Sequence, residues 1–372
     1  MKLMRIIKWT GTAILVILLL GVVAIFVSYW RSDNDCGRAA NALTNPMKAI
    51  TYCDYGSPDV LKVEEIEKPA PAADQVLVRV RAASINPLDW HMMEGMPYVL
   101  RLQAGLRKPK SMRLGVDFAG TVEAVGKEVN DFKVGDEVFG GRDGALAEYV
   151  CPRASRAIVH KPANISFEQA ASVPIAAVTA LQSLRDKAHV QPGQHVLING
   201  ASGGVGTFAV QLGKYLGAEV TGVCSTRNLD LVGSLGADHV IDYTKEDFTK
   251  NGQRYDVILD LVGTQPLSWF RPALKPKGIC VLIGGGGPNE GRWVGPMARP
   301  VKALLLSPFI SQQFVMFLAQ LKKEDLTLLS DLMQRGKVRP VVDRTFKLDQ
   351  VAEAMRYLEK GHARGKVIVA LE

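Results

Sequence analysis

A glycine-rich turn between an apolar strand and a helix is the feature of this sequence that most constrains the fold. A strand is predicted over His195–Asn199, followed by the turn Asn199–Gly206 (NGASGGVG) and a helix over Gly206–Leu216. Small residues in such a turn let the backbone approach a pyrophosphate, and the start of the helix offers N–H donors. The turn departs from a strict G-x-G-x-x-G, because one residue too many follows Gly200. Its place between strand and helix nevertheless predicts a dinucleotide-binding βαβ unit.

The chain beyond this turn continues to alternate between strands and helices. This order predicts a parallel, doubly wound sheet, in which strands buried on both faces are continuously apolar. The predicted strands are Glu219–Val223, His239–Asp242, Asp256–Val262 and Gly278–Gly284, and the predicted helices are Leu229–Leu235 and Pro266–Leu274. The uncharged stretch 303–321 is interrupted by Pro308 and by Ser and Gln residues, which favours a buried or lid helix over a membrane span.

The end of the second strand selects the cofactor. An NAD site is expected to place an acid about 20 residues beyond the first glycine, to hold the ribose 2′-hydroxyl. The end of the strand reads Val223-Cys224-Ser225-Thr226-Arg227, and no acid occurs between Val223 and Asp230. A hydroxyl with a guanidinium suits a 2′-phosphate, because arginine offers paired N–H donors. The sequence therefore predicts NADPH rather than NADH, with a solvated Arg227 as the alternative.

Short strands and glycine turns dominate the region before this sheet. Runs rich in β-forming residues predict an antiparallel barrel or sandwich over about residues 48–165. The tail returns to this mixed character, with a helix over Leu348–Lys360 and a strand over Gly365–Ala370. The chain is thus predicted to be α/β, with a β-rich domain and a doubly wound domain.

Several separated motifs in this body resemble the zinc-free quinone oxidoreductase branch of the medium-chain dehydrogenase/reductase family. They are Ser84–Asp89 (SINPLD), Gly115–Gly120 (GVDFAG), Val134–Val138 (VGDEV), Gly200–Gly206 and Leu235–Tyr243 (LGADHVIDY). The resemblance covers the chain from about Met47. It implies a GroES-like catalytic domain over 48–170, a Rossmann NADPH-binding domain over 171–320, and a segment 321–372 that completes the catalytic domain. It also implies a homodimer.

The resemblance also bears on metal and reaction. Zinc-dependent members of the family bind their metal through Cys and His, whereas Ser84–Asp89 has no cysteine and Gly115-Val116-Asp117 stands where Gly-His-Glu is expected. We therefore expect no metal. Oxidising an alcohol in the zinc enzymes uses the metal to stabilise an alkoxide. Without it, hydride transfer to an activated acceptor, a quinone or an α,β-unsaturated carbonyl, is expected.

Candidate site residues follow by matching the family motifs. Asn86 resembles the asparagine beside the nicotinamide, and Asp89 either orients this loop or forms a turn. Tyr98 either donates a proton, as in related enoyl reductases, or forms the pocket wall. Lys366 either reaches the adenine phosphate or is solvated. The other candidate cofactor residues are Thr179, Ser202, Gly203, Gly204, Val205, Ser225, Arg227, Tyr243, Val262 and Gly284.

The first thirty residues predict a membrane anchor. The 22 residues Trp9–Trp30 carry no charge, and as a helix they would span about 33 Å, enough to cross a bilayer. Residues 1–30 are therefore expected to be a transmembrane anchor and residues 31–47 a linker. The basic residues before the span favour the catalytic domain outside, whereas the cofactor favours the cytoplasm; we expect the cytoplasmic face. A bilayer would also concentrate a small lipophilic substrate.

Charge argues against one class of partner. The chain has 45 Lys and Arg against 37 Asp and Glu, a formal charge of +8. Half of this excess lies within residues 1–48, so the body shows no basic patch of the kind that binds nucleic acid. Two alternatives to the quinone or enone reductase stay open: a trans-2-enoyl thioester reductase, and an NADPH-binding redox sensor or interaction protein without turnover.

Overall fold

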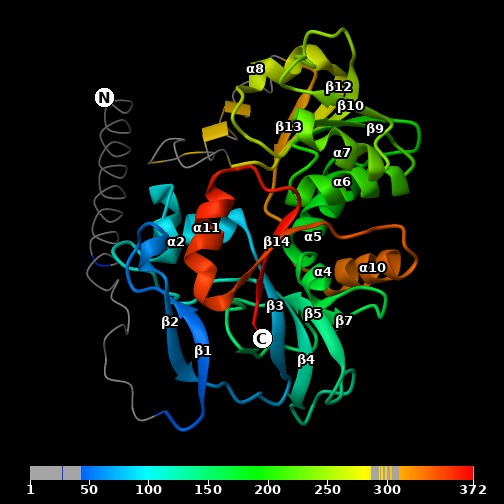
Figure 1. Cartoon of the computed structure of the whole chain (residues 1–372). Helices are drawn as coiled ribbons and strands as arrows, with labels where there is room; N and C mark the ends of the chain where they lie inside the picture. The colour runs from blue at the N-terminus through cyan, green and yellow to red at the C-terminus, as the bar shows by residue number, and fades with distance from the viewer. Residues whose placement is uncertain are drawn as a thin grey trace, which may run out of the picture.

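The fold was obtained as a computed structural model, which describes residues 43–285 and 310–371 together with residues 27, 293, 295, 298, 299, 302 and 303. Two sheets dominate it, with helices packed against them and between them (Figure 1). Both the GroES-like and the Rossmann-type domain that were predicted are present. The expected domain limits at residues 170 and 320 remain predictions.

The first sheet is parallel and has six strands. Its strand order is β10-β9-β8-β11-β12-β13, the order of a dinucleotide-binding fold. Continuous burial of the central strands on both faces explains their apolar runs. The strands are β8 (His195–Asn199), β9 (Glu219–Cys224), β10 (His239–Asp242), β11 (Tyr255–Asp260), β12 (Leu274–Leu282) and β13 (Gln313–Met316).

The second sheet is mostly antiparallel and joins distant parts of the chain. Its order is β14-β15-β3-β4-β5-β7, with β6 also paired to β3, and β1 and β2 form a separate hairpin. The last strand pairs with β3, so that Val367 lies opposite Ile85. The strands are β1 (Pro46–Thr51), β2 (Lys62–Glu67), β3 (Val76–Ile85), β4 (Asp117–Val125), β5 (Glu137–Gly141), β6 (Tyr149–Val150), β7 (Ile158–His160), β14 (Val342–Lys347) and β15 (Lys366–Ala370).

Helices cover both sheets. In Figure 1 the red α11 lies beside the cyan α2, so a helix near the end of the chain packs against one that follows β3. The α-helices are α2 (Pro87–Glu94), α3 (Arg101–Ala104), α4 (Phe167–Ala171), α5 (Pro174–Gln182), α6 (Gly204–Tyr215), α7 (Leu229–Ser234), α8 (Leu267–Phe270), α10 (Lys323–Gln334) and α11 (Val351–Glu359). The 3-10 helices are η1 (Pro58–Val60), η2 (Tyr98–Leu100), η4 (Thr226–Asn228), η5 (Arg271–Ala273) and η8 (Leu348–Gln350), and η3 (Ser183–Lys187) is a π-helix.

One hydrophobic core runs through both domains. Ala82 and Phe139 of the mostly antiparallel sheet belong to the same buried cluster as Phe208 of α6 and Leu329 of α10. All four side chains are fully buried. Since burial of apolar surface is the main stabilising term in folding, the two domains are expected to hold each other in one arrangement. This arrangement fixes the facing edges of the two sheets.

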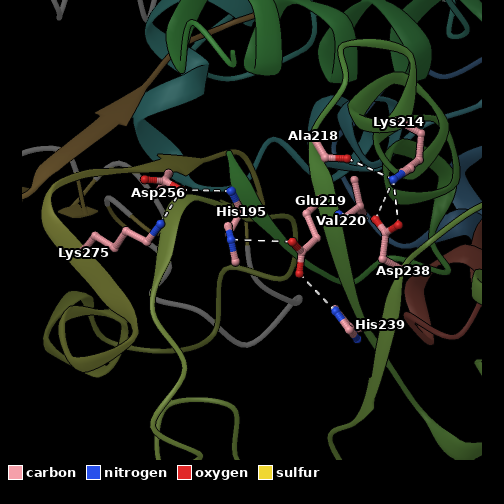
Figure 2. Close-up of polar contacts among 9 residues, drawn as sticks. All are labelled: His195, Lys214, Ala218, Glu219, Val220, Asp238, His239, Asp256 and Lys275. Carbon is pink, nitrogen blue, oxygen red and sulfur yellow. Dashed lines mark hydrogen bonds and ion pairs between the residues drawn. The ribbon is translucent and has the colours of Figure 1, made fainter. Parts of the chain in front are cut away.

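A cluster of polar side chains lies at the amino ends of the parallel strands, where its members form hydrogen bonds and ion pairs with one another (Figure 2). Glu219 lies between two imidazoles, with carboxylate oxygens 3.6 Å from Nε2 of His195 and 3.1 Å from Nε2 of His239. Asp256 accepts hydrogen bonds from the His195 backbone N–H and from Lys275 Nζ. In open α/β sheets ligands bind at the opposite, carboxyl ends of the strands. We therefore assign this cluster a structural role.

Two expectations need correction. No helix in the described ranges is long and apolar enough to cross a membrane. The predicted span Trp9–Trp30 and the linker 31–47 lie outside those ranges apart from Val27 and residues 43–47, and residues 46 and 47 belong to β1. Within 303–321, residues 313–316 form strand β13 instead of a helix, because backbone pairing with β12 gives this short apolar segment its partner.

Candidate active site

The glycine turn has the geometry of a close-approach loop. Gly200 follows β8 with φ +91°, which favours glycine, and its N–H bonds to the Val223 carbonyl of the next strand. A Cβ on Gly206 would lie 2.2 Å from the Gly200 carbonyl oxygen, whereas a Cβ on Gly203 would meet nothing nearer than 3.5 Å. Gly206 is therefore required by the turn itself. Gly203, the residue before α6, leaves open space where a ligand can approach.

A side-chain bridge joins this turn to the end of β9. The buried Asn228 donates from Nδ2 to the hydroxyls of Ser202, at 3.0 Å, and Ser225, at 3.2 Å. The Asn228 Oδ1 atom is buried without a partner. Sequence reasoning missed this residue, because only the packing of η4 against the turn reveals its role. The bridge holds two of the predicted cofactor residues together.

Arg227 and Tyr243 lie at the same end of the sheet. Arg227 Nη2 donates to the His362 carbonyl at 2.7 Å, which links the two domains at this edge. Tyr243 is 58% exposed, and its backbone N–H bonds to Cys224. The nearby Asp242 accepts hydrogen bonds from Thr226 and Thr244, which hold the pKa of its carboxyl down at about 2. The end of the second strand, β9, has no acid, whereas Asp242 ends the neighbouring strand β10. The Asp242 carboxylate is already bonded to two threonines and paired with Lys245.

The loop between β3 and α2 carries the predicted catalytic residues. Asn86 precedes the helix, Pro87 is its first residue, and Gly95 ends it in a left-handed conformation with φ +62°. Asp89 accepts hydrogen bonds from the backbone N–H groups of Asn86, at 2.7 Å, and Gly115, at 3.0 Å. The Asp89 carboxylate therefore connects α2 to the segment before β4, a contact that fits both predictions for Asp89, loop orientation and turn formation.

The Asn86 amide belongs to a buried polar network. Its Nδ2 donates to Asp117 at 3.0 Å, and its Oδ1 accepts from Lys366 Nζ. Asp117 also accepts from the Ser84 hydroxyl at 2.9 Å and lies 3.6 Å from Lys366 Nζ. Sequence reasoning did not identify Ser84 or Asp117 as members of a site, although both fall within quoted motifs. Three strands, β3, β4 and β15, bring them together.

Burial shifts the protonation of these groups. Loss of solvation raises the pKa of Asp89 to about 6, and the nearby charge of Asp117 adds to this rise. Burial also raises the pKa of Asp117 and lowers the pKa of Lys366, while their mutual attraction opposes both shifts. Groups with shifted pKa values concentrate at functional sites.

Lys366 connects this network to the glycine turn. Gly365 forms an isolated parallel bridge with Gly203, and a Cβ on Gly204 would lie 2.9 Å from Lys366 Cδ. The Lys366 residue is only 4% exposed. Neither prediction for Lys366 describes this position, because its ammonium group is neither solvated nor directed to the Arg227 edge. Pairing of β15 with β3 instead carries it to Asn86.

Two of the remaining predicted cofactor residues follow strands of the parallel sheet, and two belong to helices. Val262 follows β11 and is 41% exposed, and Gly284 follows β12 with its N–H bonded to the Asp260 carbonyl. A Cβ on Gly284 would lie 2.5 Å from the Leu261 backbone. Thr179 is a buried residue of α5. Val205, in the first turn of α6, packs against the shared core.

The ring of Tyr98 packs between two neighbouring side chains. Its ring meets that of Trp293 edge to face, with centroids 5.3 Å apart, and the Arg101 guanidinium lies over it at 4.8 Å. Arg101 is itself fixed by bonds to the Gly95 and Glu94 carbonyls. These partners hold the ring, and both roles predicted for Tyr98 remain predictions. Within the described residues, no group of three or more His, Cys, Asp or Glu is arranged to hold a metal.

Two family models match the chain. Residues 72–163 match the alcohol dehydrogenase GroES-like domain, and residues 235–369 match the zinc-binding dehydrogenase model. A chloroplastic quinone-oxidoreductase of Triphysaria versicolor is 34% identical over 339 residues, 87% of this chain and 98% of the relative. A chloroplastic NADPH-dependent alkenal/one oxidoreductase of Arabidopsis thaliana is 35% identical over 343 residues, 88% of this chain and 80% of the relative.

Solved structures resemble the fold over nearly the same range. The quinone oxidoreductase of Coxiella burnetii has a TM-score of 0.75 and 32% identity, covering 88% of this chain and all of its own. The Escherichia coli quinone oxidoreductase complexed with NADPH has a TM-score of 0.73 and 27% identity, covering 87% and 100%. Both plant relatives are named as chloroplastic, and with no membrane-spanning helix among the described residues we correct the predicted single-pass membrane location.

Proposed function

Because the chain belongs to the quinone oxidoreductases of the medium-chain dehydrogenase/reductase family, we propose that it transfers hydride from NADPH to a quinone or an α,β-unsaturated carbonyl without zinc. The observation that carries the proposal is the buried amide of Asn86, which bonds to Asp117 and to Lys366, the lysine whose side chain lies next to Gly204 of the glycine turn. The Lys366 ammonium also opposes a metal cation at Asp117, since like charges repel in a buried site.

The chain's own residues supply binding and orientation. The open side of Gly203 and the start of α6 suit the pyrophosphate, and Ser225, Arg227 and Tyr243 suit the 2′-phosphate. Thr179, Ser202, Gly204, Val205, Val262 and Gly284 are proposed to line the same cofactor site. When bound, NADPH supplies the hydride. The hydrogen bonds with Asp117 and Lys366 would hold the Asn86 amide in place beside a bound nicotinamide, in the orientation that the reaction needs.

The acceptor needs little chemical assistance from the protein. Hydride adds to an electron-poor carbon, a new C–H bond forms, and the negative charge moves to the carbonyl oxygen until a proton arrives. Hydrogen-bond donors that face this oxygen lower the barrier. The contacts of Tyr98 support a role in shaping the acceptor pocket, and solvent can deliver the proton.

Arg227→Ala tests the cofactor assignment in the same assay that tests turnover. Loss of a charge-assisted hydrogen bond of about 1.5–3 kcal/mol is expected to lower kcat/KM for NADPH about tenfold to a hundredfold and to leave that for NADH unchanged. Consumption of each cofactor with a quinone or enone acceptor measures both values. Arg335→Ala, which removes an exposed arginine paired with Asp331, is the control. An unchanged NADPH preference in Arg227→Ala would refute the assignment, and no turnover with either acceptor class would refute the function.

A further inference from the structure

The buried network around Asn86 contains more negative than positive charge. Asp89, Asp117 and Lys366 are 3%, 0% and 4% exposed. Two carboxylates and one ammonium leave one negative charge in excess. Lys366 and Asp117 lie 3.6 Å apart, and Asp89 interacts with both. Hydrogen bonds already stabilise both carboxylates, and a cationic group outside the chain would stabilise the remaining negative charge further.

The position of the network indicates which partner this is. Lys366 lies against Gly204, and the adjacent Gly365 bridges to Gly203, so the network borders the proposed pyrophosphate turn. The nicotinamide ring is neutral in NADPH and carries one positive charge in NADP⁺. The two forms of the cofactor are otherwise equally charged. The network also holds the Asn86 amide, which is proposed to lie beside the nicotinamide, so its excess negative charge would distinguish the two forms.

We propose that Asp89, Asp117 and Lys366 form an electrostatic site that stabilises the positive charge which the nicotinamide acquires as hydride leaves. The inference rests on the proposed function. In that step a C–H bond of the dihydronicotinamide breaks, its electron pair travels with the hydrogen to the acceptor carbon, and the ring becomes a cation. Asp117 and Lys366 position the Asn86 amide, and Asp89 supplies the charge in excess.

The ratio of the dissociation constants of NADP⁺ and NADPH isolates this interaction. Ionised Asp89 favours the cation, so protonating Asp89 weakens NADP⁺ binding relative to NADPH. The pKa of Asp89 is raised to about 6, so Asp89 becomes protonated between about pH 7.5 and about pH 5.5. Over this range the ratio is expected to rise about fivefold. This rise corresponds to an Asp89 pKa that is about one unit lower in the NADP⁺ complex than in the NADPH complex. Titration of the 2′-phosphate cancels, because both cofactors carry it. Quenching of tryptophan fluorescence measures both constants without turnover.

The other titratable groups around Asp89 are Tyr52 beyond β1, Asp117 of β4 and Lys366 of β15. His91, two residues farther along α2, has Nδ1 2.9 Å from the Met96 carbonyl. Asp89→Asn separates the contribution of Asp89 from these groups and is expected to abolish the pH dependence of the ratio. Asp131→Asn, at a carboxyl that is 67% exposed, should retain it.

Two results would overturn the inference: a ratio in the wild-type protein that is constant across this pH range, or a pH dependence that persists in Asp89→Asn. The wild-type measurement alone decides if Asp89→Asn does not fold. Failure of the wild-type protein to bind either cofactor would instead refute the proposed function, and the inference with it.

Discussion

Lys366→Met is expected to destabilise the protein by about 3–5 kcal/mol, the usual cost of removing one partner from a buried ion pair. The Lys366 and Asp117 side chains are 5% and 0% exposed, so water cannot replace the lost ammonium at Asp117. Asn86 Oδ1 loses its donor as well. Unfolding in urea, followed by tryptophan fluorescence, measures the change.

The stability lost in Lys366→Met should depend on pH. Asp117 has a pKa raised above 3.8 by burial, and without Lys366 it rises further. A carboxyl whose folded pKa is raised favours the folded state below its unfolded pKa, and this contribution is lost as the pH rises through the folded pKa. The free energy of unfolding of Lys366→Met therefore falls further below that of the wild-type protein at about pH 8 than at about pH 5.

The control for this variant is Lys245→Met, which removes an exposed lysine 3.5 Å from Asp242. Because this lysine is 68% exposed, its ion pair is expected to contribute only about 0–1 kcal/mol, and no comparable loss is expected. Equal effects of the two substitutions would show that Lys366 does not hold the network together.

Two glycine substitutions in the same turn are expected to fail in different ways. In Gly206→Ala the new methyl group would lie 2.2 Å from the Gly200 carbonyl oxygen, so the turn must shift at a cost of about 1–3 kcal/mol. In Gly203→Ala the backbone has an ordinary φ of −81° and the methyl meets nothing nearer than 3.5 Å. Its stability should change by less than about 1 kcal/mol.

Gly203→Ala is instead expected to raise the dissociation constant of NADPH at least about tenfold, because the methyl group fills the space through which the pyrophosphate reaches the backbone. Denaturation and NADPH titration of both variants separate the two effects. Wild-type NADPH affinity in Gly203→Ala would place the pyrophosphate elsewhere.

The parallel sheet could be predicted closely from the sequence, because strands buried on both faces leave long apolar runs. The predictions for His195–Asn199 and His239–Asp242 have the observed bounds. Strand β13 escaped prediction, since its four residues lie in an uncharged stretch without a strand pattern and only the edge of β12 orders them.

The candidate site could be predicted only where its residues are neighbours in the sequence. Asn86 and Asp89 belong to one local motif and carry its helix-capping pattern. The contact between Lys366 and Asn86 joins residues 280 positions apart, and no local pattern can predict it. Asn228 was missed for a related reason, because its two hydroxyl partners belong to different turns.

Transfer of deuterium from [4,4-²H₂]NADPH to an α,β-unsaturated ketone tests the central claim most directly. The account predicts one deuterium at the β-carbon of the saturated product and one NADP⁺ for each ketone reduced, detected by mass spectrometry and NMR. NADPH that binds but is not consumed with enones or quinones would contradict it, as would turnover confined to enoyl thioesters.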